Sequence, residues 1–315
     1  MSRFVAVVGT VNRDVIIDAS GERRTSLGGI LYNVIPLAAL LEGSGLRVRP
    51  VGRLGRTDRD EAMGLLSAFP SVDADTLIAD AAGTDLSILD YSGGGERAET
   101  VVMRVAPLSE EDLAAARGAE AVLVNMISGR DVPLETLTSF RRGERGRFLF
   151  DVQALARTAE TPRASRIVPD APGWSRLFHV VRGSETEIGY FGGTPGNVEA
   201  AAERILAAGA GEVLATYGER GAVRYVRGEG GLRRSETPAV RCDAPADPTG
   251  CGDSFLSGVC AGGLLGLSPE DAVRLGALVA SRVVGLAGLE SLVALRSIRH
   301  EALAHEPAWA AFFGD

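Results

Sequence analysis

The chain has 315 residues, of which 45% are hydrophobic and 23% charged, proportions typical of an ordinary globular protein. The formal net charge is −8 and no basic cluster is present, which argues against nucleic acid as a partner. The longest apolar stretches, such as 34–41, are much shorter than the roughly 20 residues of a membrane-spanning helix. No signal peptide is indicated, and the three cysteines lack metal-site spacing. We therefore expect a cytoplasmic protein with reduced thiols and no membrane partner.

All 33 basic residues are arginine, because lysine is absent from the sequence. A Walker A loop and a protein kinase both need a lysine beside the phosphates of the nucleotide. An enzyme that works through a Schiff base also needs a lysine amine. The composition therefore argues against these three classes.

Short apolar runs alternate with helix-like segments along the chain. The expected strands are residues 4–8, 48–54, 121–125, 147–152, 177–182, 212–216 and 222–226. The expected helices include 31–41, 59–68, 198–208, 254–267 and 271–286. Continuous apolar strands separated by helices predict a parallel sheet covered on both faces, so we expect a single domain over residues 1–315. Ligands of such sheets bind in the loops at the carboxyl ends of the strands.

Two regions interrupt this alternation. Segments 84–91 and 100–104 are joined by a glycine-rich stretch at 92–96, and a similar pair of extended segments lies within about 12–26. We expect these residues, about 12–26 and 84–104, to form a small separate β-sheet that covers the main domain as a lid. The alternative is a pair of surface hairpins without a function.

A turn with two glycines precedes the apolar helix at 254–267. Gly250 and Gly252 let the backbone approach an anion closely, and the N–H groups that open the helix favour negative charge. The field of the helix should keep Asp253 ionised. A carboxylate beside a phosphate site suits the removal of a proton from an attacking hydroxyl. The alternative is an ordinary turn with a helix-capping aspartate.

The longer segment Asp-Pro-Thr-Gly-Cys-Gly-Asp at 247–253 resembles the C-terminal signature of the ribokinase, or PfkB, family of carbohydrate and nucleoside kinases. Cys251 replaces the usual alanine, and its N–H would contribute to the anion site with those of Gly250 and Gly252. The resemblance implies a three-layer α/β sandwich with a mostly parallel central sheet and a small β-sheet lid. It also implies transfer of phosphate from ATP to a hydroxyl, with Asp253 as the general base.

Three further motifs resemble motifs of this family in the same order: Gly-Thr-Val-Asn-Arg-Asp at 9–14, Gly-Gly-Ile-Leu-Tyr-Asn at 28–33, and residues 51–58. The third motif is shifted by one residue at its end. The first two imply a site for sugar hydroxyls, and its expected residues are Asn12, Asp14, Gly28, Gly29 and Asn33.

Two other motifs resemble the nucleotide side. Thr-Tyr-Gly-Glu-Arg-Gly at 216–221 matches the family's nucleotide loop, which implies ATP contacts from Thr216, Gly218 and Gly221. Ser184 stands where the family has asparagine, and Glu187 keeps the glutamate that helps to organise Mg²⁺.

The signature also implies a monovalent-cation site. Asp247 and the carbonyl of Thr249 stand where many relatives ligate K⁺, and oxygen ligands suit such a hard cation.

The sequence motifs do not identify the substrate, because the glutamate that binds ribose in ribokinases is replaced by the stretch around Ile127. The first expectation is a sugar or sugar-like substrate, and the alternative within the family is a nucleoside. A catalytically idle binding protein is a third reading. A sugar-phosphate kinase is a fourth, for which Arg13, Arg53 and Arg97 are the candidate phosphate ligands. The resemblance also makes a homodimer formed through the lid a reasonable expectation.

Overall fold

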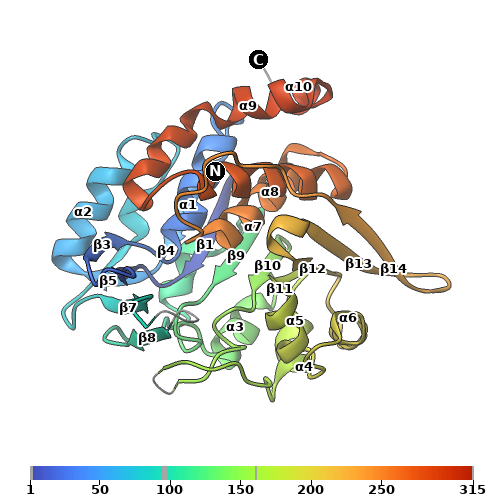
Figure 1. Ribbon diagram of the computed structural model, residues 1–315, viewed down its shortest axis with the longest axis horizontal. Coiled ribbons are helices and arrows are strands. Elements are labelled where there is room, and N and C mark those ends of the chain that lie inside the picture. Colours follow the sequence, from blue (N-terminus) through green and yellow to red (C-terminus); the bar gives the residue numbers. More distant parts are fainter. Residues whose placement is uncertain (1–2, 94–97, 160–161, 314–315) are drawn as a thin grey trace.

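The computed structural model describes residues 3–93, 98–159 and 162–313. An eight-stranded sheet lies at its centre (Figure 1). In sheet order the strands are β14 (Gly231–Thr237), β13 (Ala222–Gly228), β12 (Glu212–Thr216), β11 (Val180–Ser184), β10 (Arg147–Asp151), β9 (Ala121–Asn125), β1 (Phe4–Gly9) and β4 (Arg47–Val51). The strands from β4 to β12 are parallel, whereas β13 and β14 continue the sheet antiparallel. The expected mostly parallel sheet is confirmed.

Helices cover both faces of this sheet, which gives three layers (Figure 1). On one face lie α1 (Leu31–Leu40), α2 (Arg56–Leu66), α7 (Cys251–Leu265), α8 (Pro269–Val284), α9 (Ile298–His305) and the short α10 (Ala310–Phe313). On the other lie α3 (Leu134–Arg141), α4 (Ala171–Ser175), α5 (Glu185–Phe191) and α6 (Val198–Ala207).

Strand β1 shows why its sequence is continuously apolar. Successive side chains point to opposite faces, so Val5 and Val7 join the core under α1 and α7, while Ala6 and Val8 join the core on the other side. All six residues of β1 are buried. A central strand between two helical layers has no solvated face, and it therefore lacks the alternation of an edge strand.

Helices α7 and α8 pack closely through facing glycines. A Cβ added to Gly258 would lie 2.6 Å from the Cα of Gly276, and one added to Gly276 would lie 2.7 Å from the carbonyl oxygen of Phe255. The glycines thus fix the position of α7, whose first turn carries Asp253.

A second sheet of four strands has the order β3-β2-β7-β8. These strands are β2 (Asn12–Ile17), β3 (Arg23–Leu27), β7 (Asp85–Asp90) and β8 (Ala98–Val102). They fall within the segments from which a lid was expected, and we call this sheet the lid sheet. Of the predicted hairpin loop at 92–96, residues 94–96 lie outside the described residues.

The prediction of one continuous strand at 48–54 is wrong, because this segment contributes to two separate strands. Residues 47–51 form β4 in the main sheet, and β5 (Arg53–Gly55) pairs instead with β6 (Ile78–Asp80). The break falls at Gly52, where an added Cβ would lie 2.5 Å from the carbonyl oxygen of Gly9. The close approach of two backbones excludes a side chain there and turns the chain out of the sheet.

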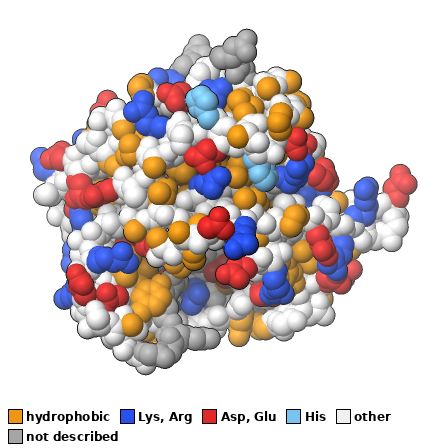
Figure 2. All heavy atoms as spheres, turned by 45° about the horizontal axis from the view of Figure 1, so that its top comes forward, with side chains coloured by type: hydrophobic (Ala, Val, Ile, Leu, Met, Phe, Trp, Pro, Cys, Tyr) orange, Lys and Arg blue, Asp and Glu red, His pale blue; other side chains and the backbone are white. Residues whose placement is uncertain are grey.

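Figure 2 shows acidic and basic side chains interspersed over the face of the molecule that it displays. Within the part of the chain that the structure describes, no helix has the length and apolar character needed to cross a membrane.

Candidate active site

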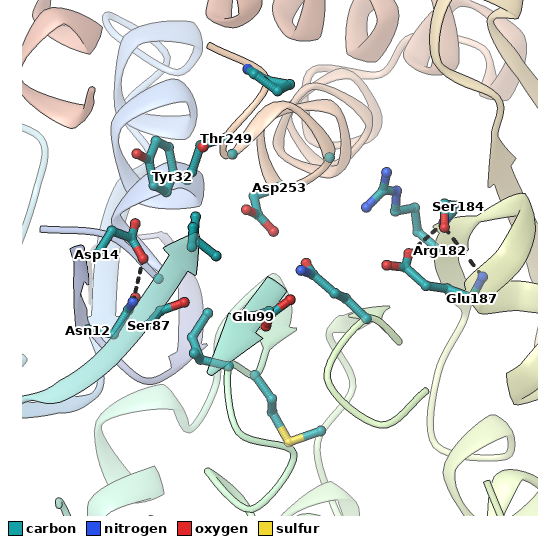
Figure 3. A pocket seen from close by; sticks show the side chains of 18 residues that line it. Asn12, Asp14, Tyr32, Ser87, Glu99, Arg182, Ser184, Glu187, Thr249 and Asp253 are labelled. Carbon is teal, nitrogen blue, oxygen red and sulfur yellow. Dashed lines mark hydrogen bonds between the residues drawn. The ribbon is translucent and has the colours of Figure 1, made fainter. Parts of the chain in front are cut away.

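A cavity of about 190 Å³ lies where the carboxyl edge of the main sheet, the start of α7 and the lid sheet meet (Figure 3). We call its α7 side, residues 250–253, the anion turn. We call its lid side the acceptor wall, which is formed by Asn12, Asp14, Ser87 and Glu99. Arg182, Ser184 and Glu187 also line the cavity, from the end of β11 and the start of α5.

The anion turn depends on both of its glycines. Gly250 has φ +76°, and an added Cβ would lie 2.1 Å from the ring of Tyr32. A Cβ on Gly252 would lie 2.3 Å from Nη1 of Arg182. The backbone therefore lies directly against an aromatic ring on one side and a guanidinium on the other. The open N–H groups of a helix start add donors for a negatively charged group.

Asp253 lies in the first turn of α7 and is held from two sides. Its Oδ1 accepts a hydrogen bond of 2.9 Å from Nδ2 of Asn125, at the end of β9. The same Nδ2 donates to Oδ1 of Asn33 over 2.7 Å. Nδ2 of Asn33 in turn donates to the backbone oxygen of Asp253 over 2.8 Å. These bonds fix both the carboxylate and its helix relative to the main sheet.

This geometry gives Asn33 a different position from the expected one. Asn33 is fully buried in α1 and is not among the residues that line the cavity. Asn125, which the sequence motifs did not single out, contacts the carboxylate instead. Asparagine at the carboxyl end of a parallel strand is the sequence feature that could have identified it.

Burial raises the pKa of Asp253 to about 7, and the nearby negative charge of Asp151 adds to this effect. The positive charge of Arg182 and the hydrogen bond from Asn125 act in the opposite direction but do not cancel it. The expectation of a fully ionised carboxyl at neutral pH is therefore not met, because burial and the charge of Asp151 raise its pKa. A pKa near neutrality is the value that suits a general base.

Arg182 is a second residue that the motifs missed. The register of the sheet aligns Asn125, Asp151 and Arg182 across three neighbouring strands at the carboxyl edge. Nη1 of Arg182 donates to Oδ2 of Asp151 over 2.6 Å, and Nη2 donates to Oγ1 of Thr216 over 2.7 Å. The guanidinium thus lies beside Gly252 with one partner carboxylate behind it. An arginine within an otherwise apolar strand was the available signal.

Ser184 and Glu187 are brought to the cavity by a capping box that starts α5. Oγ of Ser184 accepts from the N–H of Glu187, and Oε2 of Glu187 accepts from the N–H of Ser184 over 2.7 Å. A serine caps a helix as well as an asparagine does, which explains the departure from the family motif. Figure 3 shows both side chains beside Arg182.

The predicted nucleotide loop lies at the same edge of the sheet. Thr216 ends β12 directly beside Ser184 and contacts Arg182. Gly218 and Gly221 belong to the turn that follows, and they are not among the described residues that line the cavity.

On the acceptor wall, Nδ2 of Asn12 donates to Oδ1 of Asp14 over 2.7 Å. Gly28 lies behind this pair, since an added Cβ would lie 2.1 Å from Oδ2 of Asp14. Gly29 has φ +64° and lines the cavity, with no room for a Cβ beside the carbonyl of Thr10. The two glycines therefore admit the carboxylate and turn the chain into α1.

The start of the signature carries two buried oxygen atoms that have no hydrogen-bond partner among the described residues. These are Oδ2 of Asp247 and Oγ1 of Thr249. Oδ1 of Asp247 accepts from the N–H of Thr249 over 2.9 Å, and the guanidinium of Arg24 lies 3.9 Å from Oδ2. Burial raises the pKa of Cys251 to about 12, so its thiol is not activated. In the described part of the chain, no group of three or more His, Cys, Asp or Glu residues is placed to hold a metal ion.

Two of the three candidate phosphate-binding arginines are engaged elsewhere. Arg13 pairs with Asp58 and Glu61 over 2.5 Å each. Arg53 pairs with two other carboxylates, at 3.3 and 2.9 Å. Neither arginine lines the cavity, and Arg97 lies outside the described residues.

The fold and the cavity define a kinase of the ribokinase fold, and the comparisons with known proteins give its family. Residues 135–293 match the model of the "pfkB family carbohydrate kinase". The chain is 30% identical to 1-phosphofructokinase of Haloferax volcanii over 305 residues, which cover 90% of this chain and 89% of that protein. It is also 35% identical to inositol 3-kinase of Oryza sativa subsp. japonica over 191 residues, covering 58% of this chain and 43% of that protein.

Among solved structures, the sulfate complex of a pyrophosphate-dependent kinase in the ribokinase family superposes with a TM-score of 0.77 at 21% identity. The superposition covers 90% of this chain and 96% of that one. The chain belongs to the pfkB family of carbohydrate kinases. It is a carbohydrate kinase with a ribokinase-like α/β fold.

Proposed function

We propose that this kinase transfers the γ-phosphoryl group of ATP to a hydroxyl of a sugar or sugar-like molecule, with Asp253 as the general base. The observation that carries the proposal is the meeting of three features in one cavity. Gly250 and Gly252 of the anion turn, the half-buried Asp253 and the Asn12–Asp14 pair all line it. Phosphoryl transfer needs little beyond positioning and charge stabilisation, and these features supply both.

Each group has a distinct task in this proposal. Asp14 accepts hydrogen bonds from substrate hydroxyls and orients the acceptor. Asp253 takes the proton of the hydroxyl that attacks phosphorus. The N–H groups of Gly250 and Gly252 stabilise the charge of the transferring phosphoryl group, whereas the expected donor Cys251 uses its N–H for the carbonyl oxygen of Pro248, over 3.2 Å. Arg182 lies beside Gly252 and adds a positive charge, while Asp151 holds its guanidinium in place.

The donor site extends from the anion turn toward β12. Ser184, Glu187 and Thr216 lie together at that edge, and Gly218 and Gly221 form the turn beyond it. We assign ATP to this region. The buried Arg182 beside the turn would also suit pyrophosphate, the donor of the kinase named in the similar structure. Parallel assays with ATP and pyrophosphate decide between the two donors.

Glu187 fits a role in binding Mg²⁺ with the donor phosphates, because its carboxylate lines the cavity and adds to the negative field at Asp253. Mg²⁺ is typically held by one or two carboxylates together with phosphates and water. When bound, it would neutralise charge on the phosphates. For K⁺ the proposed ligands are Asp247 and the carbonyl of Thr249, beside the anion turn. Oδ2 of Asp247 has no hydrogen-bond partner among the described residues, and the guanidinium of Arg24 lies 3.9 Å from it.

The acceptor has an alternative within the family, since a nucleoside also presents ribose hydroxyls to the Asn12–Asp14 pair. An idle binding protein is disfavoured by Asp253, whose carboxylate lines the cavity and keeps its amide partner Asn125. We also propose a homodimer formed through the lid sheet. Its edge strand β8 and the residue after it expose Val102 and Met103.

The test replaces Asp253 by asparagine, which keeps the shape of the side chain and removes the base. We expect kcat for acceptor phosphorylation to fall by about 10²-fold or more, the scale of general-base catalysis. Binding of an unreactive ATP analogue should change little. Asp75→Asn is the matched control, because its side chain is 93% exposed. Near-normal turnover by the Asp253→Asn variant, measured as ADP release, would contradict the proposal.

A further inference from the structure

We infer that a second cavity, between helix α2 and the edge strand β4, binds a small organic carboxylate, and that its occupancy acts on the lid sheet. This cavity has a volume of about 450 Å³, and we call it the α2 cavity. It lies at the β4 edge of the main sheet, on the side of α2 in Figure 1. Among the described residues, none lines both this cavity and the active-site cavity.

Three segments of the chain line the α2 cavity. The C-terminal half of α2 contributes Met63 and Leu66, and strand β4 contributes Arg47 and Arg49. The remaining lining residues belong to segment 67–76, and its apolar members are Phe69, Pro70, Val72 and Ala74. A volume of about 300–1,000 Å³ and an apolar lining with a few fixed polar groups are typical of small-molecule sites. The α2 cavity has both properties.

Two arginines form the basic side of the cavity. Arg47 and Arg49 are two residues apart in β4, so their side chains point to the same face. Nε of Arg47 donates to Oδ1 of Asp73 over 2.5 Å, and Nε of Arg49 donates to Oδ2 of Asp73 over 2.9 Å. The guanidinium carbon of Arg49 also lies 3.8 Å from the centre of the Phe4 ring, a cation–π contact. Both guanidinium groups are therefore held in place before a ligand binds.

These contacts leave hydrogen-bond donors for a ligand. In the described part of the chain, Nη1 of Arg47 and both Nη atoms of Arg49 make no hydrogen bond, and the two side chains are 37% and 28% exposed. A guanidinium binds a carboxylate through two parallel hydrogen bonds. Two arginines that share Asp73 have an excess of one positive charge, which matches a singly charged carboxylate. Asp75 also lines the cavity, but it is 93% exposed and lies 3.8 Å from Arg59, so its charge is largely screened.

Helix α2 connects this cavity with the lid sheet. Its N-terminal half carries Asp58 and Glu61, and both carboxylates pair with Arg13 over 2.5 Å. Arg13 lies on lid strand β2 between Asn12 and Asp14, which line the active-site cavity. A packed helix transmits a displacement along its length. A ligand that contacts the C-terminal half of α2 therefore acts on β2 through the N-terminal half.

The segment opposite α2 is bonded to both other walls of the cavity. Nε of Arg59, in α2, donates to the carbonyl oxygen of Leu77 over 2.9 Å. Oγ1 of Thr76 donates to the carbonyl oxygen of Pro50, in β4, over 2.6 Å. A ligand that fits this arrangement stabilises it in proportion to its preference for it over other arrangements. We therefore expect a bound carboxylate to stabilise the contacts of Arg13 and to lower KM for the acceptor.

The first experiment measures binding of phenylacetate by isothermal titration calorimetry. The kinase is saturated with an unreactive ATP analogue and Mg²⁺, so that the anion turn is occupied. We expect phenylacetate to bind at least about 10-fold more tightly than the uncharged 2-phenylethanol, the scale of losing hydrogen bonds to a charged group. Absence of binding at millimolar phenylacetate overturns the site. Tighter binding of phenyl phosphate than of phenylacetate overturns the assigned class of ligand.

Arginine variants locate the bound phenylacetate. Arg47→Gln and Arg49→Gln should each weaken its binding by about 10-fold or more. Two separate variants are used because Arg49 also packs on Phe4, whereas Arg47 is more exposed. Arg241→Gln is the matched control, since that arginine is 89% exposed, and it should bind phenylacetate normally. Unchanged affinity in both Arg47→Gln and Arg49→Gln overturns the site.

Kinetics test the connection with the lid sheet. KM for the best acceptor is measured with and without saturating phenylacetate, and we expect it to fall by about 5-fold or more, the lower end of common allosteric effects. Asp58→Asn should reduce this effect and leave phenylacetate binding intact, because it removes one contact of Arg13. An unchanged KM with phenylacetate bound overturns the effect on the lid. The calorimetric result does not depend on the proposed reaction, so failure of the proposed function would be recognised separately.

Discussion

The anion turn and the acceptor wall face each other across one cavity, but they are built in different ways. The anion turn is a contiguous stretch of four residues, and its function lies in backbone N–H groups and one carboxylate. The acceptor wall takes four side chains from three strands of the lid sheet, and Arg163, 64 residues after Glu99 in the chain, holds Glu99 from a loop. The anion turn is therefore a sequence motif, whereas the acceptor wall is brought together only by the folding of the lid sheet.

The two sides also differ in where a cation lies. Arg182 lies beside the anion turn, and the negative charges of Asp151, Glu187 and Asp253 stabilise its guanidinium despite its burial. At the acceptor wall, Asp14 and Glu99 are both acidic. A site that moves a phosphoryl group needs fixed positive charge, whereas a site that binds hydroxyls needs hydrogen-bond acceptors. In the proposed function, one side of the cavity therefore determines the reaction and the other side the substrate.

The largest loss of activity is expected from a substitution at Gly252, because the anion turn has no space for a side chain there. In Gly252→Ala, the new Cβ would lie 2.3 Å from Nη1 of Arg182 and would displace the guanidinium from the turn. We expect kcat/KM for the donor to fall by about 10²-fold, the scale of losing one preorganised electrostatic contact. Steady-state kinetics with varied donor concentration measure this loss.

Gly64→Ala is the matched control for that substitution. Gly64 lies within α2, and an added Cβ would meet nothing within 4 Å. Alanine there should leave the kinetics unchanged and stabilise the helix by about 1 kcal/mol. Equal kinetics of the two variants would show that the contact between Gly252 and Arg182 does not affect catalysis. That result would contradict the role given to the anion turn.

A smaller effect is expected from pH, because Asp253 must be ionised to accept a proton. With its pKa raised to about 7, kcat/KM should fall about tenfold for each unit below pH 7 and level off above it. Asp253→Asn should lack this dependence in its residual activity. A rate that stays constant from pH 8 down to pH 5 would exclude Asp253 as the titrating base.

The same pKa shift predicts that the stability of the folded protein falls as the pH rises, whereas the activity increases. The folded protein keeps the proton of Asp253 up to about pH 7, whereas an unfolded aspartate loses it near its ordinary value of 3.8. Stability from this group is thus fully present below about pH 4 and is lost as the pH rises through 7. Asp253→Asn should therefore raise the Tm of the ligand-free protein at pH 8 and change it much less at pH 4.

The smallest effect is expected from potassium. If Asp247 and the carbonyl of Thr249 bind K⁺, replacing K⁺ by a large organic cation at equal ionic strength should lower the rate several-fold. Asp247→Asn should weaken this response. Equal rates in the two cations would contradict the proposed site.

The central sheet and its two helical layers could be predicted because buried parallel strands have a continuous apolar pattern. The strands at 121–125 and 212–216 were predicted with their exact bounds. Strand β14 was missed because its residues are mostly exposed and polar, so neither hydrophobicity nor alternation marks it. The break at Gly52 was missed because it depends on the distance to another strand, and local sequence carries no such information.

The residues of the site also fall into two groups, those that a local motif reveals and those that only the fold brings together. Gly250, Gly252 and Asp253 could be recognised together, because backbone geometry requires them to be adjacent in sequence. The role of Arg182 becomes visible only when the register of three strands aligns it with Asp151 and Asn125. Glu99 was missed for a related reason, since its contact with Arg163 spans the lid sheet and a distant loop.

The bonds among Asn33, Asn125 and Asp253 have a consequence for synthesis of the chain. Consecutive members of this set lie 92 and 128 positions apart along the sequence, and Asp253, the proposed base, is the last of them to be made. Until α7 has been synthesised and packed, the two amides have no carboxylate to hold. In the proposed function, a growing chain therefore has its lid strands and the whole main sheet before it has its base, because α7 follows the last strand, β14.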